Sequence, residues 1–447
     1  MTELLLPAGN LEKLNAAYDY GADAVYAGLP RYSLRARNNE FRLEQLATGL
    51  QIARARGKRL YVTCNILPHN DKVRSFVRQL QPLVDLQPHA LIMADPGLIL
   101  LAREQWPDLA IHLSVQANTL NYAAVRFWQK VGVRRIILSR ELSLSEIEEI
   151  RQQCPDMQLE VFVHGALCIA YSGRCLLSGY FNRRDPNQGT CTNACRWSYQ
   201  LRADDAGDAV GATPLPGFDM RHELQAAESA CSATGLVRHP RADHVYQIEE
   251  EQRSGEWMPI EEDEHGTYIM NSRDLRAVEH VERLLAIGVD ALKIEGRTKS
   301  LYYVARTAQA YRQAIDDARA GRAFDARLLG DLEALAQRGY TSGFLHRHAA
   351  DSTQNYTQGS SQTGTHQYVG QVLRIDAGWA VVDVKNRFAC GDQLDIIHPQ
   401  GNTSMTLQHL TDLDGRELTV APGHGHHVRF ALDARFQGAL IARRLPA

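Results

Sequence analysis

Short apolar runs alternate with amphipathic segments through the first half of the chain. After the run Leu4–Leu6, apolar residues recur at helical spacing from Leu11 to Tyr18, and Gly21 stands where such a helix would end. Strands that alternate with helices indicate a parallel sheet, and eight such units would close a TIM-like (β/α)8 barrel. The runs that we expect to form its strands are Leu4–Leu6, Ala24–Ala27, Leu60–Cys64, Ala90–Ala94, Ile111–Val115, Ile136–Ser139, Leu159–Val163 and Ala291–Arg297.

The pattern changes after the seventh run. Residues 198–266 indicate a loop-rich, acidic insertion, with EEEQ at Glu249–Gln252 and EEDE at Glu261–Glu264. We expect this insertion to follow a cysteine-containing loop at residues 164–197. The apolar run Thr267–Ser272 has no assigned place in the barrel.

The rest of the chain predicts a second, smaller domain. Helical patterns near Leu301–Ala320 and Ala326–Arg338 complete a first domain that we place at residues 1–345. Residues 346–366 have the polar composition of a linker. Residues 367–447 contain short alternating runs, which predict a small antiparallel β-barrel that either binds RNA or serves packing.

Strand parity predicts a polar barrel interior, because successive strand residues face opposite sides. In Ala291–Arg297, the apolar side chains occupy one face and Lys293, Glu295 and Arg297 occupy the other. The apolar face should pack on the helices, which turns the charged face inward. The same rule places two further sets inside the barrel, namely His112, Ser114 and Gln116, and Glu160, Phe162 and His164.

Two interpretations of this interior stay open. One is a buried ion network that satisfies itself, such as Lys293 with Glu295 or Glu160, since buried charges are normally paired. The other is a polar substrate pocket, because chemistry in such barrels takes place at the carboxyl ends of the strands. The polar residues that we expect at those ends are Asn65, Asp95, Gln116, Asn118, Arg140, His164 and Arg297.

Composition excludes few classes of protein. The 447 residues are 44% hydrophobic and 23% charged, as in a water-soluble globular protein, and no apolar run is long enough to span a membrane. The start, MTELLLPAGN, lacks the basic segment of a signal peptide, so we expect a cytoplasmic protein. With a net charge of −3, an RNA partner would need local basic patches. Candidate arginines are Arg31, Arg35, Arg37, Arg134, Arg135, Arg140, Arg183 and Arg184.

Four of the eight cysteines gather in one short segment with the spacing C-x6-C-x15-C-x3-C. They are Cys168, Cys175, Cys191 and Cys195. Four thiolates suit an iron–sulfur cluster. A structural zinc site is the second interpretation, although zinc ligands usually pair as C-x2-4-C. Disulfides are the third, and a reducing compartment disfavours them.

The segment LEVFVHGALCIAYSGRCLLS, which contains Cys168 and Cys175, resembles the signature of the U32 "peptidase" family. LLLPAG, GADAVYAG and ALKIEGRTKS resemble further segments of that family. RYSLRARNNEF and RDPNQGTCTNACRW are similar to its tRNA-modifying branch. The resemblance implies a 4Fe-4S cluster on the four cysteines. It also implies an oxygen-independent hydroxylase that forms 5-hydroxyuridine at the wobble position of tRNA, with prephenate as co-substrate and an unknown electron donor.

Candidate roles follow from this resemblance together with the inward faces. We assign catalytic roles to His164, Lys293 and Glu295, and substrate contacts to Arg140, Arg297, Asn65, Gln116 and Asn118. Tyr32, Phe41 and Tyr61 are candidates for stacking on the target base.

Three other functions remain. Relatives in the superfamily hydroxylate a ribosomal RNA cytidine or a quinone precursor, and the family's older label is peptidase or collagenase. The sequence has no HExxH or GxSxG motif, which leaves only Cys168 with His164 as a thiol–imidazole pair. A non-enzymatic RNA-binding or redox-sensing protein is the last alternative.

Overall fold

A computed structural model describes residues 2–29, 32–33, 40–166, 199–203, 246–250, 257–263, 266–269, 271–335, 339–346, 354–355 and 365–445. The four clustered cysteines lie outside these residues, as do the candidate arginines Arg31, Arg35, Arg37, Arg183 and Arg184.

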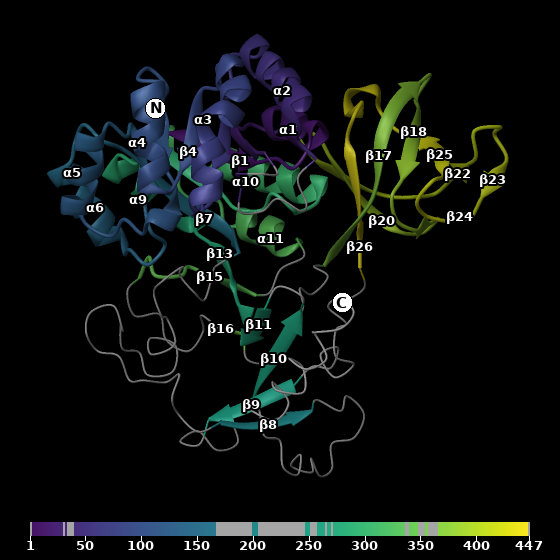
Figure 1. Ribbon diagram of the computed structural model, residues 1–447. Helices are drawn as coiled ribbons and strands as arrows, with labels where there is room; N and C mark the ends of the chain where they lie inside the picture. Colours follow the sequence, from purple (N-terminus) through teal and green to yellow (C-terminus); the bar gives the residue numbers. More distant parts are fainter. Residues whose placement is uncertain are drawn as a thin grey trace, which may run out of the picture.

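Eight parallel strands close a barrel in the described part of the chain (Figure 1). They are β1 (Glu3–Pro7), β2 (Ala24–Gly28), β3 (Arg59–Cys64), β4 (Ala90–Met93), β5 (Ile111–Leu113), β6 (Arg135–Ile137), β7 (Gln158–Ala166) and β14 (Ala291–Ile294). Each strand pairs with the next, and β14 pairs with both β7 and β1, which closes the ring. The expected TIM-like barrel is confirmed.

Helices cover the outside of the barrel (Figure 1). They are α1 (Leu11–Asp19), α2 (Leu43–Ala55), α3 (Asn70–Asp85), α4 (Pro96–Gln105), α5 (Tyr122–Val131), α6 (Leu144–Gln153), α9 (Val281–Ile287) and α10 (Leu301–Arg319), with α11 (Arg327–Glu333) packed against α10. Side chains cap several of their amino ends, as Asn121 does for α5 and Ser300 for α10. In the described residues, no helix is both long and apolar enough to cross a membrane.

The described residues of the insertion form an antiparallel sheet, and the described parts of its acidic runs lie on strands and not in loops as expected. Its strands are β8 (Tyr199–Ala203), β9 (Tyr246–Glu250), β10 (Trp257–Asp263) and β11 (Gly266–Ile269). The run Thr267–Ser272 contributes to β11 and to β12 (Asn271–Ser272), and β12 pairs with β16 (Gln354–Asn355). Because these strands belong to other sheets, the run has no place in the barrel. Figure 1 shows this sheet below the barrel.

The chain returns to the barrel through β13 (Asp274–Arg276). This strand pairs antiparallel with the carboxyl end of β7, with Asp274 opposite Ala166, and it pairs parallel with β15 (Tyr340–Thr341). The residues between β7 and β13 therefore leave the barrel and re-enter it at one point.

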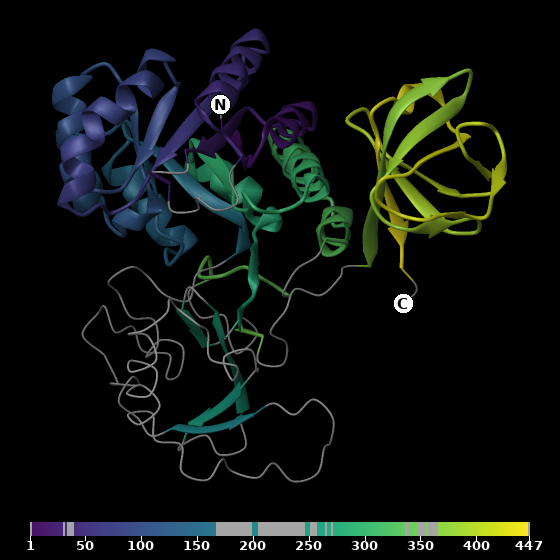
Figure 2. The same cartoon turned by 45° about the vertical axis from the view of Figure 1, so that its right-hand side comes forward.

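The C-terminal module is an antiparallel sheet that curls into a half-barrel, drawn in yellow-green in Figure 2. Its strands are β17 (His366–Asp376), β18 (Trp379–Val384), β20 (Gln393–Ile397), β21 (Thr403–Thr406), β22 (Leu410–Thr411), β23 (Glu417–Leu418), β25 (His427–Ala431) and β26 (Leu440–Arg444), with a separate pair of β19 (Phe388–Ala389) and β24 (Val420–Ala421). It has its own apolar core around Val382, Phe388 and Phe430. The predicted antiparallel β-module is confirmed.

The module docks on the outside of the barrel. The Tyr302 ring of α10 stacks on Tyr368 of β17, with centroids 5.7 Å apart. The hydroxyl of Tyr20, which follows α1, donates to the Ile397 carbonyl at 2.8 Å. The side chain of Gln309 reaches the His398 carbonyl at 3.1 Å.

Candidate functional site

Strand register fixes which side chains point into the barrel, because paired residues of parallel strands face the same side. Tyr26 pairs with Tyr61, and Gly28 pairs with Thr63, two residues further toward the carboxyl ends of β2 and β3. On the opposite side of the barrel, His112 pairs with Arg135, and Lys293 pairs with Phe162. The interior is therefore polar over much of its height, as the strand parity predicts.

The lower layer of the interior is an ion network. Arg135 donates to Glu3 at 2.7 Å and to Glu160 at 3.3 Å, and Lys293 donates to Glu160 at 2.7 Å. The Tyr61 hydroxyl donates to Glu3 at 2.8 Å. These four charged side chains are at most 6% exposed and carry two charges of each sign. Of the two interpretations of the barrel interior, the buried ion network with internally paired charges therefore describes this lower layer.

Lys293 belongs to this layer. Burial lowers the pKa of its ammonium group, and the neighbouring Glu160 carboxylate partly opposes that effect. Arg135, a candidate for a basic patch that binds RNA, is also buried here. It lies inside because β6 begins at Arg135 itself rather than at Ile136.

Two aromatic rings separate the ion network from the mouth of the barrel. The Lys293 ammonium lies 4.4 Å from the centroid of Tyr26 and 5.5 Å from that of Phe162. The guanidinium of Arg140 lies 3.9 Å from the same Phe162 ring. Phe162 therefore contacts one cation of the lower layer and one of the mouth.

Charged side chains converge at the mouth. Arg297 donates through Nη1 to Ser33 Oγ at 2.6 Å and to Thr63 Oγ1 at 2.8 Å. Glu295 accepts from the Tyr26 hydroxyl at 3.3 Å, and Arg140 lies 3.9 Å from the same carboxylate. Both signs of charge are thus present where the strands end.

A group of amide side chains lies beside these charges. The side-chain amide of Asn65 donates to the side-chain oxygen Oε1 of Gln116 at 2.9 Å, and the Ser114 hydroxyl donates to the same Oε1. Gln116 lies in the short 3-10 helix Val115–Ala117, which follows β5. Asn118 ends that helix in the left-handed conformation, and its buried Oδ1 has no hydrogen-bond partner among the described residues.

His164 does not face the barrel interior as parity suggested. A bulge in the pairing of β7 with β14 advances the register by one residue, so that Phe162 pairs with Lys293 but His164 pairs with Ile294. The imidazole packs instead against Tyr303 and Tyr311 of α10 and against Tyr340. Burial lowers its pKa to about 3, and Arg276 and Lys299 add to that shift, so the ring is neutral.

The candidate stacking residues are also not at the mouth surface. Tyr32, Phe41 and Tyr61 are each at most 2% exposed, and Tyr61 belongs to the ion network. Sequence reasoning missed Tyr26 and Ser33. Tyr26 pairs with the inward-facing Tyr61, and that pairing would have placed Tyr26 inside the barrel. Nothing in the sequence indicates the position of Ser33.

The segment that carries the four cysteines is tied to this same mouth. The chain leads into that segment from the carboxyl end of β7, and it re-enters the barrel at β13, whose Asp274 pairs with Ala166. Four thiolates are a donor set that fits an iron–sulfur cluster.

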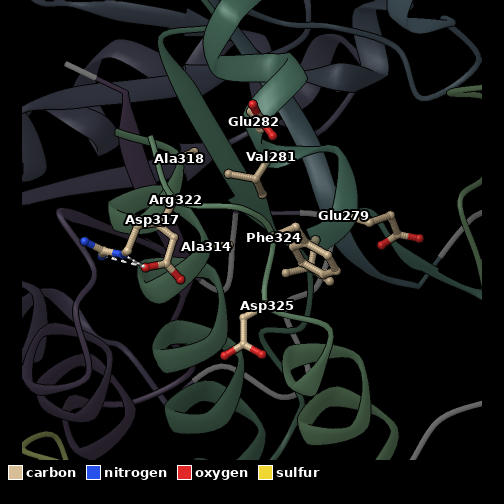
Figure 3. A pocket seen from close by; sticks show the side chains of 10 residues that line it. Glu279, Val281, Glu282, Ala314, Asp317, Ala318, Arg322, Phe324 and Asp325 are labelled. Atoms are coloured by element: carbon tan, nitrogen blue, oxygen red, sulfur yellow. Dashed lines mark hydrogen bonds and ion pairs between the residues drawn. The ribbon is translucent and has the colours of Figure 1, made fainter. Parts of the chain in front are cut away.

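A hollow on the outside of the barrel is separate from the mouth (Figure 3). Its walls come from α9, α10 and the chain before α11, and they include Glu279, Asp317 and Asp325. Arg322 donates to Asp317 there at 2.6 Å. The hollow shares no residue with the mouth.

Two family models match the chain. "Peptidase family U32" matches residues 9–355, and "Peptidase family U32 C-terminal domain" matches residues 364–443. The tRNA hydroxylation protein P of Escherichia coli is 57% identical, covering 99% of this chain and 96% of that protein. The protein of the same name from Haemophilus influenzae is 52% identical with the same coverage. A protein named collagenase from Porphyromonas gingivalis is 25% identical, covering 94% of this chain and 91% of its own length.

Proposed function

The chain belongs to peptidase family U32, and on that premise we propose that it is an iron–sulfur-dependent hydroxylase of a tRNA base. The RNA substrate is supported by two relatives named for tRNA hydroxylation, each more than half identical over nearly the whole chain. Within the fold, one observation carries the proposal. Charged and amide side chains converge at the carboxyl ends of the strands, where barrels of this type perform their chemistry.

Cys168, Cys175, Cys191 and Cys195 would hold the cluster, which we take to be of the 4Fe-4S type. Such a cluster would supply an iron centre able to exchange electrons or to act as a Lewis acid. The proposal is supported by the point of departure of the cysteine segment, because Ala166 and Asp274 lie at the mouth of the barrel.

The finer proposal is that the product is 5-hydroxyuridine at the wobble position, formed without oxygen and with prephenate as co-substrate. Bases of an anticodon loop can be splayed out of their stack, so a uracil can enter a concave mouth. Transfer RNA is also the reason that we place the protein in the cytoplasm.

The residues of the mouth suit distinct tasks. Arg297 and Arg140 are cations that could bind the carboxylates of prephenate, since guanidinium groups pair with carboxylates through two parallel hydrogen bonds. Asn65, Gln116 and Asn118 offer amide donors and acceptors, which match the polar edge of a base. Glu295 is the carboxylate at the mouth that could accept a proton.

Lys293 and His164 fit supporting tasks better than direct catalysis. Lys293 is held by Glu160 beneath the aromatic rings, and the neutral His164 lies between β7 and α10. A thiol protease would need an accessible imidazole beside its cysteine. With only 1% of His164 exposed, the geometry gives the peptidase alternative little support.

Mass spectrometry of nucleosides tests the proposal. Total tRNA from cells with the intact gene should contain 5-hydroxyuridine or its derivatives, and tRNA from cells lacking the gene and any redundant hydroxylase should not. The Cys191→Ala variant should fail to restore the product. Cys390→Ala is the matched control, because Cys390 lies in the C-terminal module and should restore it fully.

An unchanged tRNA nucleoside profile would contradict the proposal. Ribosomal RNA nucleosides and quinones from the same cells would then show whether a hydroxylated cytidine or a quinone precursor depends on the gene. Cleavage of collagen by the purified chain would instead support the peptidase alternative.

A further inference from the structure

The guanidinium of Arg140 rests on an aromatic ring at the mouth of the barrel. Its carbon Cζ lies 3.9 Å from the centroid of Phe162, which is the shortest contact between a cation and a ring among the described residues. At that distance the planar group lies against the face of the ring, as arginines stacked on aromatic side chains do. Phe162 therefore fixes where the plane of the guanidinium lies.

The turn that carries Arg140 is held by the neighbouring strand ends. The backbone N–H of Leu138 donates to the Glu160 carbonyl at 2.9 Å, which continues the pairing of β6 with β7. On the other side, the backbone N–H of Ser139 donates to the Thr119 carbonyl at 3.2 Å. Backbone contacts on both sides and the ring beneath thus place the guanidinium together.

The guanidinium is accessible from the mouth. Its ion pair with Glu295 is 3.9 Å long, which is longer than a hydrogen bond, and its side chain makes no hydrogen bond to another described residue. Arg306 and Arg443 each have a buried nitrogen without a partner, whereas Arg140 has none, so its nitrogens reach the solvent. The side chain of Arg140 is 14% exposed and Phe162 is 5% exposed. A ligand that enters the mouth therefore meets the guanidinium before the ring.

Amide side chains lie next to this turn. Thr119, which accepts from Ser139, directly follows Asn118, and the buried Oδ1 of Asn118 has no hydrogen-bond partner among the described residues. Asn118 in turn ends the short helix that contains Gln116. A planar base whose face lies on the guanidinium would direct its polar edge sideways, toward the neighbouring strand ends where these amides lie.

We infer that Arg140 is the residue on which the target base stacks, and that Phe162 is the positioning residue that holds its guanidinium. This inference rests on the proposed function. Bases that leave the stack of an RNA loop commonly lie on arginine planes as well as on aromatic rings. Stacking uses the face of the guanidinium, whereas a carboxylate binds at its edge, so an experiment can separate the two tasks.

The test measures binding of anticodon stem-loop RNA to the purified full-length, cluster-loaded protein. One RNA carries uridine at the wobble position, and the other carries dihydrouridine, whose saturated ring is puckered but keeps the same polar edge. Arg140→Lys keeps the charge and loses the plane, and Phe162→Leu removes the ring beneath it. Arg126→Lys is the matched control, because Arg126 also lies over a ring, that of Tyr122 at 5.2 Å, on the outside of the barrel.

The expected readout is the ratio of the affinities for the two RNAs. In Arg140→Lys, the preference for uridine over dihydrouridine should fall about tenfold relative to the wild type, which lies within the range for one stacked base. Phe162→Leu should reduce the same preference in the same direction, and Arg126→Lys should leave it unchanged. A purely structural effect would lower the melting temperature and weaken both RNAs equally, so that the ratio stays constant. If Phe162→Leu fails to fold, Arg140→Lys still decides.

Binding of prephenate separates the alternative task. Isothermal titration calorimetry of Arg140→Lys should give an affinity for prephenate within about threefold of the wild type, because a base stacked on Arg140 leaves the carboxylate contacts to other residues. A lysine replaces an arginine poorly where two parallel hydrogen bonds hold a carboxylate. Loss of prephenate binding with an unchanged RNA preference would therefore make Arg140 a carboxylate contact and overturn the inference.

An Arg140→Lys variant that keeps the wild-type preference for uridine would also overturn the inference. The proposed function fails separately. If the preference depends on Arg140 but nucleoside analysis finds no hydroxylated product, Arg140 remains the base contact and the hydroxylase activity falls. If the product is found while the preference ignores Arg140, only the stacking role falls.

Discussion

At the scale of the residue, the buried charges of the barrel divide by partner. Among the described residues, the four charged side chains of the ion network pair with each other and with neutral side chains, and the exposed Arg59 also reaches Glu3. Replacing one charged member of such a network leaves its partner's charge buried and unpaired, in a medium that solvates it poorly. Replacing two members of opposite charge together leaves no such unpaired charge. The network should therefore behave as a unit in unfolding experiments.

Substitution of Glu160 tests this unit. Glu160→Gln should lower the free energy of unfolding by about 3–5 kcal/mol, because it leaves Lys293 without its carboxylate. The double variant Glu160→Gln/Lys293→Met should lose less than the sum of the two single variants, by about 2 kcal/mol or more. Urea unfolding at neutral pH measures all four proteins. Arg56→Gln, which breaks the exposed pair with Asp19, should cost less than about 1 kcal/mol. Additive losses at Glu160 and Lys293 would contradict the prediction.

The neutral His164 predicts a pH dependence. Its pKa is about 3 in the folded protein, against an ordinary value of 6.5, so the unfolded chain takes up the proton first. Stability from this residue is complete above pH 6.5 and falls as the pH drops toward 3, by about 1.4 kcal/mol per unit. His164→Phe should remove that contribution. Between pH 7 and pH 5 the variant should therefore lose about 2 kcal/mol less than the wild type in urea unfolding. Equal losses in both proteins would show that His164 takes up its proton in the fold.

Sequence alone placed most inward-facing residues correctly, yet it misjudged two for one reason. A prediction of inward-facing residues from strand parity requires that the first residue of the strand is known and that the strand pairs without a bulge. Arg135 seemed to precede its strand although β6 begins with it, and His164 seemed to follow the parity of Phe162 although a bulge intervenes. Neither the first residue of a three-residue strand nor a bulge leaves a mark in the apolar pattern. The hydroxyl contacts of Arg297 were equally hidden, because Ser33 lies in an irregular segment.

At the scale of the element, the carboxyl end of β7 is the most constrained part of the barrel. Within a few residues it pairs with β14, then bulges, and then pairs with β13. Gly165 lies at this point with a φ of +101°, and a β-carbon there would stand 2.5 Å from the carbonyl oxygen of Glu295. Both backbone conformation and space require glycine.

Gly165→Ala should therefore destabilise the fold. The strained φ costs about 1–3 kcal/mol, and the clash with a backbone oxygen adds to it because backbone cannot swing aside. We expect the free energy of unfolding to fall by more than about 2 kcal/mol in urea titrations. Gly330→Ala, in the open space of α11, should leave stability unchanged or raise it slightly. An alanine at position 165 that is tolerated without loss would show that β7 and β14 can separate at that point.

The elements of the barrel were predictable because each strand run is apolar and is followed by a helical period. All eight expected runs overlap observed strands. The strands of the insertion were not predictable from the sequence, because they carry acidic residues that are typical of loops, such as Glu261 and Glu262 of β10. β8 also pairs with β9, a strand far along the chain, and composition cannot reveal such a pairing.

At the scale of the whole molecule, the half-barrel and the TIM-like barrel share an interface. Ile397, Leu440 and Ala442 of the module join the apolar core of the large domain, and the Tyr302–Tyr368 stack lies beside them. Burial raises the pKa of Tyr302 to about 12, in keeping with a ring removed from water. The two domains should therefore unfold together.

Tyr302→Ala should uncouple the domains. Loss of the ring removes the stack and part of the shared core, at a cost of about 3–5 kcal/mol. Differential scanning calorimetry should show one transition for the wild type and two for the variant. Phe127→Ala is the control, since that ring is 56% exposed on α5 and its loss should leave one transition. A single transition at an unchanged temperature in Tyr302→Ala would mean that other contacts hold the module.

The antiparallel pairing of β7 with β13 gives the barrel a modular character. Ala166 and Asp274 pair with each other, so the chain leaves β7 and enters β13 at adjacent positions. The entropy of closing a loop grows only with the logarithm of its length, so the barrel is nearly indifferent to how much chain is inserted there. The eight strands of the barrel should therefore keep their pairing when the length of chain between Ala166 and Asp274 changes.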